Sequence, residues 1–270
     1  MATTDDDVTY DEMWLLDGAR DYRVAIEGAR ELRIAQDASG ARWKWGLHST
    51  VWEAPLLVRA YLTDPRRFAA DPSGTRAPLA GLRVLELGAG TGVAGMVAAA
   101  LGARVVLTDV PEALAQLQHN VDENWRADDD DDAAAAGGGG ESDSEPRARS
   151  PRPTVRALCW GEPPPPGLGE FDLVLVADCV YDSKLYAPLV RTLADVAPTA
   201  ATTVLLANLD RRGSEPDFFR GLAAAGFALE AIDGYDDEAR AACDGRASGR
   251  FFFYRAARAR EGAAPVAPPR

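Results

Sequence analysis

Closely spaced glycines mark the segment 88–95, GAGTGVAG, which directly follows the apolar run 82–87. Gly90 to Gly95 has the form G-x-G-x-x-G, in which glycines let the backbone turn sharply and approach a ligand. The amino end of the following predicted helix carries partial positive charge, which favours an anionic group. That group is a phosphate if the ligand is a dinucleotide and a carboxylate if it is S-adenosylmethionine. The glycines alone fit both ligands.

Two acidic residues belong to the same region. Asp109 ends the next predicted strand, where a carboxylate can accept hydrogen bonds from the ribose hydroxyls of either cofactor, or can simply cap the strand. Glu86 precedes Gly88 by two residues, at a strand end that NAD-binding turns usually keep apolar. A carboxylate there can anchor the ammonium group of a methionine moiety through water or backbone groups, or it can accept hydrogen bonds from neighbouring backbone N–H groups. Glu86 therefore favours S-adenosylmethionine.

Strands and helices alternate along most of the chain. Apolar runs predict strands at residues 82–87, 104–109, 154–159, 171–177, 202–208, 227–232 and 249–255. Helices are predicted at residues 51–62, 92–101, 111–125, 183–197 and 214–226. This order predicts an α/β fold with one doubly wound, Rossmann-like sheet of seven strands, which binds its ligand at the carboxyl ends of the strands. Alternating apolar residues in the segment 22–34 predict an additional N-terminal β-hairpin.

The composition separates one domain, residues 22–259, from three segments of low apolar content. These are the acidic N-terminal segment 1–21, the insertion 127–153 and the tail 260–270. The insertion runs through five Asp, four Ala and four Gly to an end rich in Ser, Pro and Arg. Too few apolar side chains are present to offset the entropy of ordering, so we expect the insertion and the tail to be disordered.

Charge and residue usage argue against several classes of function. The formal net charge of −13 opposes binding to nucleic acid, and no apolar run reaches the roughly 20 residues of a membrane span. The three cysteines, Cys159, Cys179 and Cys243, form no C-x-x-C pair, and the two histidines are not spaced with acids as metal ligands, so we expect no metal. The N-terminus is acidic where a leader peptide needs positive charge, so we expect the protein in the cytoplasm or the nucleus. We also expect it to be a monomer.

Four segments together resemble the seven-strand methyltransferases of family 16, which include protein-lysine methyltransferases acting on molecular chaperones and translation factors. In order along the chain they are VWEAPLLVRAYL, VLELGAGTGVAGMVAAALGARVVLTD, LCWGE and FDLVLVADCVYD. Within the last segment, Asp178-Cys179-Val180-Tyr181 resembles the family's D-x-x-Y motif at the end of the fourth strand. The resemblance extends over about residues 51–259 and favours methyl transfer. The chain also lacks a recognisable His, Tyr/Lys or Cys constellation for hydride transfer.

The resemblance implies roles for individual residues. It places Trp52 against the methyl donor, and Gly88, Ala89 and Gly90 along the methionine and ribose of the donor. It places Asp109 on the ribose hydroxyls, Trp160 beside the adenine, and Ala177 at the strand end below the donor. Asp178 is the candidate acceptor that orients the incoming amine, and Tyr181 shapes the entrance. A position in the core is the alternative for the two tryptophans. A helix cap is the alternative for Asp178, although Asp182 and Ser183 are better placed for that role.

We therefore expect an S-adenosylmethionine-dependent methyltransferase that modifies a lysine of an intracellular protein, with chaperones and translation factors as the target classes that the resemblance implies. Methyl transfer from a sulfonium is an in-line displacement, so positioning and desolvation carry most of the catalysis. Two alternatives stay open. The fold also serves small-molecule methyltransferases, and a non-catalytic scaffold could bind the cofactor without turnover. The intact Asp178 to Tyr181 motif argues against the scaffold.

Overall fold

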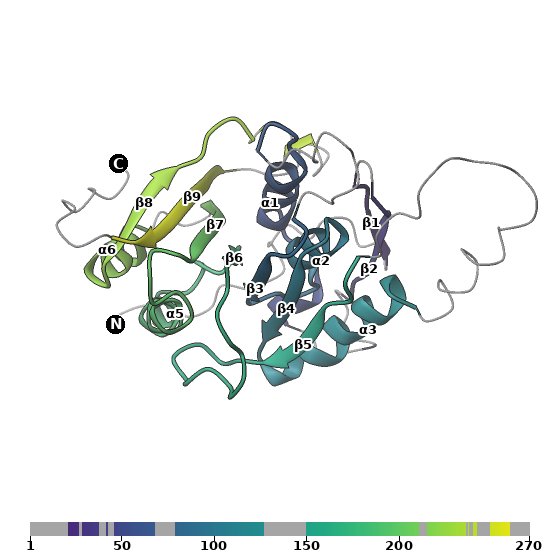
Figure 1. Ribbon diagram of the computed structural model, residues 1–270, viewed down its shortest axis with the longest axis horizontal. Helices are drawn as coiled ribbons and strands as arrows, with labels where there is room; N and C mark the ends of the chain where they lie inside the picture. Colours follow the sequence, from purple (N-terminus) through teal and green to yellow (C-terminus); the bar gives the residue numbers. More distant parts are fainter. Residues whose placement is uncertain are drawn as a thin grey trace, which may run out of the picture.

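The central sheet holds seven strands in the order β5-β4-β3-β6-β7-β9-β8 (Figure 1). They are β3 (Arg83–Leu87), β4 (Arg104–Asp109), β5 (Thr154–Ala157), β6 (Leu173–Ala177), β7 (Thr203–Asp210), β8 (Phe227–Ala231) and β9 (Arg250–Arg258). The first five strands of this order are parallel, whereas β9 is antiparallel to β7 and β8. The predicted fold class and all seven predicted strands are confirmed, with shifts of a few residues at the ends.

The computed structural model describes residues 21–26, 29–37, 42, 46–67, 79–126, 150–210, 215–235, 237, 240–241 and 249–259. The predicted acidic segment up to residue 20, the tail from residue 260, most of the predicted insertion and Cys243 lie outside the described residues. In the described part of the chain, no helix combines the length and the apolar character needed to cross a bilayer.

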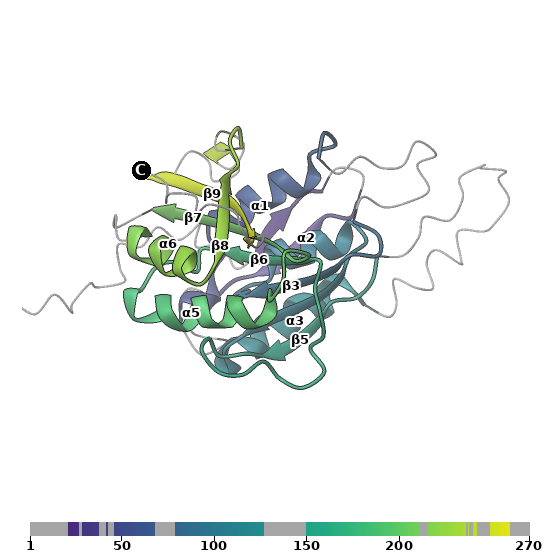
Figure 2. The same cartoon turned by 60° about the vertical axis from the view of Figure 1, so that its left-hand side comes forward.

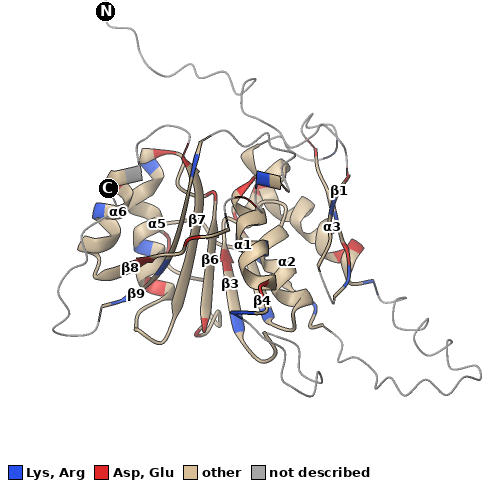
Figure 3. Ribbon diagram, turned by 90° about the horizontal axis from the view of Figure 1, so that it is seen from above, with Lys and Arg blue, Asp and Glu red and all other residues tan. Residues whose placement is uncertain are grey.

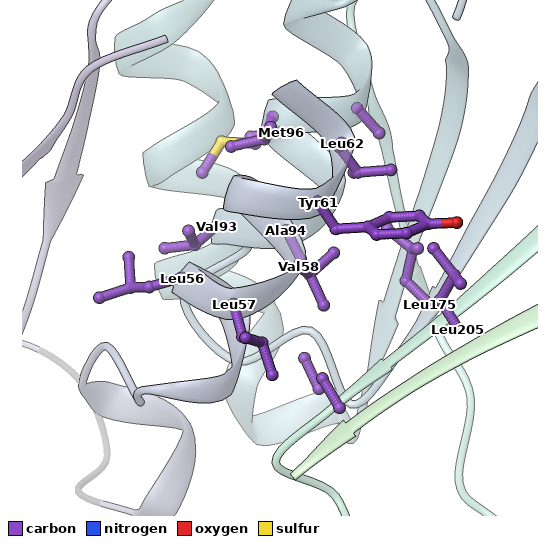
Figure 4. Close-up of a cluster of buried hydrophobic side chains, with 14 of the residues drawn as sticks. Leu56, Leu57, Val58, Tyr61, Leu62, Val93, Ala94, Met96, Leu175 and Leu205 are labelled. Carbon is purple, nitrogen blue, oxygen red and sulfur yellow. The ribbon is translucent and has the colours of Figure 1, made fainter. Parts of the chain in front are cut away.

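Helices cover both faces of the sheet. The helices α1 (Ala54–Thr63), α2 (Val93–Ala100) and α3 (Leu114–Asn124) share one buried cluster, and α5 (Ser183–Val196) and α6 (Glu215–Ala224) pack side by side in a second one (Figure 2). Alternate residues of β6 serve the two clusters, because successive side chains of a strand point to opposite faces. In the first cluster, α1 places Val58 and Tyr61 near Leu175 and Leu205 of the sheet (Figure 4).

The predicted hairpin is confirmed as β1 (Asp21–Val24) paired with β2 (Leu32–Ala35). Three buried amide side chains on one face of α3 attach it to the domain. Gln116 donates to the carbonyl oxygen of Ala35 at 3.1 Å, Asn120 accepts from the N–H of Ala35 at 2.9 Å, and Asn124 both accepts from and donates to the backbone of Arg33. These amides satisfy the edge of β2 as another strand would.

The end of α3 and the last residues of the predicted insertion, which the structure describes, lie together. The indole N–H of Trp125 donates to the carbonyl oxygen of Ser150 at 3.2 Å, and Arg152 donates to the carbonyl oxygen of Trp125 and forms an ion pair with Asp122. The strand β5 begins at Thr154, so this junction lies at the amino ends of the parallel strands. The glycine turn lies at the opposite, carboxyl end of the sheet.

Replacing residues 127–149 by a short glycine linker should leave the affinity for S-adenosylhomocysteine within a factor of about two of the wild-type value, because the junction lies at the end of the sheet opposite the ligand. Titration calorimetry with the two proteins measures this affinity, and thermal unfolding serves as the control for the fold. A large loss of affinity in a deletion variant that unfolds at the wild-type temperature would show that the insertion reaches the ligand.

Candidate active site

A cavity of about 350 Å³ opens at the carboxyl ends of β3, β4 and β6. This volume lies within the range of small-molecule sites, roughly 300 to 1,000 Å³. Nine of the ten residues selected from the sequence line it: Trp52, Gly88, Ala89, Gly90, Asp109, Trp160, Ala177, Asp178 and Tyr181. The tenth, Glu86, lies behind the glycine turn. The structure therefore brings together side chains that are widely separated along the chain.

The glycine turn is fixed by its backbone conformation and by close neighbours. Gly88 and Gly90 have φ values of +62° and +53°, in the left-handed region that favours glycine. A Cβ atom at Gly88 would lie 2.7 Å from the ring of Trp160 and 2.8 Å from Sγ of Cys179. No side chain fits there, so the wall of the cavity is formed by bare backbone on which the indole of Trp160 packs directly.

Asp109 ties this turn to the neighbouring strand. One carboxylate oxygen accepts from the N–H of Gly90 and the other from the N–H of Val110, both at 2.7 Å. The side chain is buried, with 9% of the residue exposed, and burial raises the pKa of Asp109 while the two N–H groups oppose that rise. Each oxygen still has a lone pair, so the carboxylate can hold the turn and accept ribose hydroxyls at the same time.

Glu86, the one acidic residue of β3 (Figure 3), is 1% exposed. Its Oε2 atom accepts from the N–H of Gly95 in the first turn of α2 at 2.8 Å. Burial raises the pKa of Glu86 to about 8. The geometry matches the alternative in which the glutamate binds backbone N–H groups, and a contribution to the methionine ammonium stays a prediction.

Asp178 holds two elements together with its carboxylate. Oδ2 accepts from the N–H of Ala54 at the start of α1, and Oδ1 accepts from the N–H of Leu209 in β7, both at 2.9 Å. It is the one non-glycine residue with a positive φ, +55°, among the described residues. Asp182, as expected, caps α5 by accepting from the N–H of Lys184. Asp178 therefore also serves as a cap, but of α1 rather than of the helix that follows it.

Sequence reasoning missed two groups that shape the cavity. Asn208, 2% exposed, exchanges hydrogen bonds with the backbone of Val180 in both directions, at 3.1 and 3.2 Å, and so fixes the loop between Asp178 and Tyr181. Its signal in the sequence was a lone amide within the apolar run of β7. His48 lines the cavity and had no neighbouring pattern to mark it.

No group of three or more His, Cys, Asp or Glu residues within the described ranges is arranged to hold a metal ion. The side chains present fit S-adenosylmethionine instead. The buried carboxylate of Asp109 lies where the ribose is expected, and the ring of Trp160 lies where the adenine is expected. The backbone of Gly88, which leaves no room for a Cβ atom, lies where the methionine is expected. These positions are the ones that the resemblance implies, and the contacts of the individual residues with the donor stay predictions.

Comparison with known proteins decides the family. A family model described as lysine methyltransferase matches residues 28–135 and 143–225, more than half of the chain. The chain belongs to this lysine methyltransferase family. The predicted reaction and the predicted methyl donor, S-adenosylmethionine, are thereby confirmed. The match also includes β2, the second strand of the hairpin, which the resemblance noted in the sequence did not reach.

This S-adenosylmethionine-dependent lysine methyltransferase has relatives at about one-third identity. It is 30% identical over 208 residues to EEF1A lysine methyltransferase 3 of Xenopus tropicalis, covering 77% of each chain. It is 34% identical over 181 residues to protein N-lysine methyltransferase METTL21A of Danio rerio, covering 65% of each chain. Among solved structures, a TehB-like SAM-dependent methyltransferase from Corynebacterium glutamicum aligns with a TM-score of 0.45 at 16% identity, covering 76% of this chain and 100% of that chain.

Asp109→Ala should weaken binding of S-adenosylhomocysteine by about ten- to a hundredfold, because it removes charge-assisted hydrogen bonds to the ribose and releases the N–H of Gly90. Titration calorimetry measures the loss. Asp172→Ala is the matched control, since Asp172 accepts from the N–H of Arg83 at the other end of the same sheet. Equal affinities of Asp109→Ala and wild type would remove Asp109 from the donor site.

Glu86→Gln should flatten the pH dependence of stability. The pKa of Glu86 in the fold, about 8, exceeds the ordinary 4.5, so the protonated side chain is favoured there. Its stabilisation is complete below about pH 4.5 and is lost as the pH rises through about 8. Urea unfolding from pH 5 to 9 should therefore show a decline in the wild type, on the order of a few kcal/mol, that the glutamine variant lacks. The same decline in both proteins would contradict this assignment.

Proposed function

We propose that the enzyme methylates a lysine on the surface of an intracellular protein, with an elongation factor of the EEF1A kind as the first candidate. The supporting observation is the mouth of the cavity. Val110 and Tyr181 are the large hydrophobic side chains that stand out as exposed among the described residues, at 39% and 37%, and both line this cavity. Exposed apolar side chains gathered at one site mark a contact surface for a macromolecule. A small acceptor would not need them.

The charges around the cavity suit a basic acceptor. Asp178 and Asp182 belong to its lining, which includes no Lys or Arg among the described residues, and the chain has a formal net charge of −13. A lysine ammonium is drawn to such a site, where it must lose its proton before the nitrogen can attack. The rings of Trp160 and Tyr181, with centroids 6.4 Å apart, form an aromatic wall beside which desolvation lowers the pKa of the incoming amine.

Asp178 has two roles in this proposal. Both of its oxygens accept backbone N–H groups, which positions the start of α1 and hence Trp52, two residues earlier. The carboxylate also orients the amine, while Tyr181 shapes its path. S-adenosylmethionine supplies the electrophilic methyl group when bound. The residues of this chain contribute by positioning the two reactants and by excluding water.

Asp178→Ala should lower methyl transfer at least about a hundredfold in single-turnover reactions while leaving the affinity for S-adenosylhomocysteine within a few-fold of wild type. The variant also leaves the N–H groups of Ala54 and Leu209 without this acceptor, so its unfolding free energy must be measured in parallel. Asp172→Ala, which removes an acceptor of the Arg83 N–H at the other end of the sheet, is the control for general loosening. Tyr181→Phe should cost less activity than Tyr181→Ala. Undiminished transfer by Asp178→Ala would remove this residue from the catalytic step.

The target class is tested by labelling a cell extract with radioactive methyl donor and the purified enzyme. We expect label on a protein, in methyl-lysine, and purified elongation factor should accept the label in a second reaction. Label on a chaperone instead would overturn the elongation factor as first candidate and keep a protein substrate. Label confined to small molecules would overturn the proposed class of substrate.

A further inference from the structure

Acidic side chains outnumber basic ones among the ionisable residues that line the cavity. Besides the two thiols and the phenol, they are the acids Asp109, Asp178 and Asp182 and the single base His48. Among the described lining residues, His48 is thus the one that can carry positive charge. The methyl donor carries two positive groups, the sulfonium and the ammonium, which the acids suit, and one negative group, the α-carboxylate. The carboxylate needs a different partner.

We propose that His48 binds the α-carboxylate of S-adenosylmethionine and makes donor affinity depend on pH. The inference rests on the donor placement proposed above, with the ribose at Asp109 and the transferable methyl group toward Tyr181. The methionine then extends along the backbone of Gly88 to Gly90. The backbone of His48 borders that part of the wall, because a Cβ atom at Gly90 would lie 3.5 Å from the carbonyl oxygen of His48 and 3.6 Å from its Cα.

The position of His48 is fixed by its surroundings. It lies in the 3-10 turn η2 (Leu47–Ser49), and its ring occupies space that only a glycine at position 46 leaves open, since a Cβ atom there would lie 2.6 Å from Cε1 of the ring. On one side of it, the indole N–H of Trp52 donates to the carbonyl oxygen of Leu47 at 2.5 Å. On the other side, the carbonyl oxygen of Ser49 accepts from Gln116 at 3.0 Å. The imidazole is therefore preorganised rather than carried on a loose loop.

Acidic side chains surround His48. Asp109 faces it from the end of β4, and the charge of His48 acts to lower the pKa of Asp109. Asp178 and Asp182 face the same cavity from the loop after β6. Glu86, behind the turn, has a pKa of about 8. Histidine changes its charge between about pH 5 and 8, so a carboxylate ligand should bind more weakly as the pH rises through that range.

The experiment is titration calorimetry with S-adenosylhomocysteine and with its decarboxylated analogue, which keeps the amine, at pH 6.0 and 8.5. The proteins are wild type, His48→Gln and His119→Gln. His119, on α3, is the other of the two histidines in the chain and is the matched control. The difference in affinity between the two ligands on one protein measures the contribution of the carboxylate. Glu86 and the ligand amine are the same in both variants, so a pH dependence that only His48→Gln loses comes from His48.

We expect His48→Gln to weaken S-adenosylhomocysteine about tenfold at pH 6.0, the lower end for a charge-assisted hydrogen bond at a partly exposed site, and to lose most of the wild-type pH dependence. The decarboxylated analogue should bind wild type and His48→Gln alike, and His119→Gln should behave as wild type. Equal losses for both ligands would show a structural role only and overturn the inference, as would pH-independent binding to wild type. Failure of wild type to bind S-adenosylhomocysteine at either pH would instead refute the donor site itself.

Discussion

The hydrogen bond from the N–H of Gly90 to the carboxylate of Asp109 is the contact on which the geometry of the site depends. It joins the turn after β3 to the end of β4, and the N–H of Ala89 reinforces it by donating to the carbonyl oxygen of Thr108 at 2.9 Å. A buried carboxylate is stable only where hydrogen bonds replace its water, and here the backbone supplies them before any ligand arrives. The carboxylate predicted to bind the ribose is thus held in place in advance, so that little reorganisation would be needed on binding.

The N-terminal hairpin supports the wall of the cavity formed by η2 and the glycine turn, without lining the cavity itself. Gln116 and Asn120, one helical turn apart on α3, bind the backbone of Ala35, and Asn120 also donates to the carbonyl oxygen of Thr91 in the glycine turn. From β2 the chain continues to Gln36, whose side chain accepts from the N–H of Val51 at 2.8 Å. One buried amide network therefore sets the hairpin, η2 and the glycine turn relative to one another.

The sequence was sufficient for the elements and for the location of the cavity, because both follow from local rules. Apolar runs and helical periodicity specify strands and helices, and parallel strands place their carboxyl ends at one edge. It was insufficient for the partners of the carboxylates. Glu86 binds a residue nine positions away and Asp178 one that is 124 positions away, and no local pattern specifies such pairs. His48 was not selected from the sequence for the same reason, because its proposed role follows from the side chains that surround it in the cavity.

The caps illustrate how a correct local rule can still assign a residue incompletely. A carboxylate just before a helix predicts an N-cap, and Asp182 fulfils that rule for α5. Asp178, four residues earlier, was thereby left for catalysis, yet it caps α1 through space. A single carboxylate thus supports the fold and also lines the cavity. The predicted loss of activity on its removal would therefore have two physical causes, and only transfer rates read alongside donor affinity and unfolding free energy separate the orientation of the amine from the support of α1.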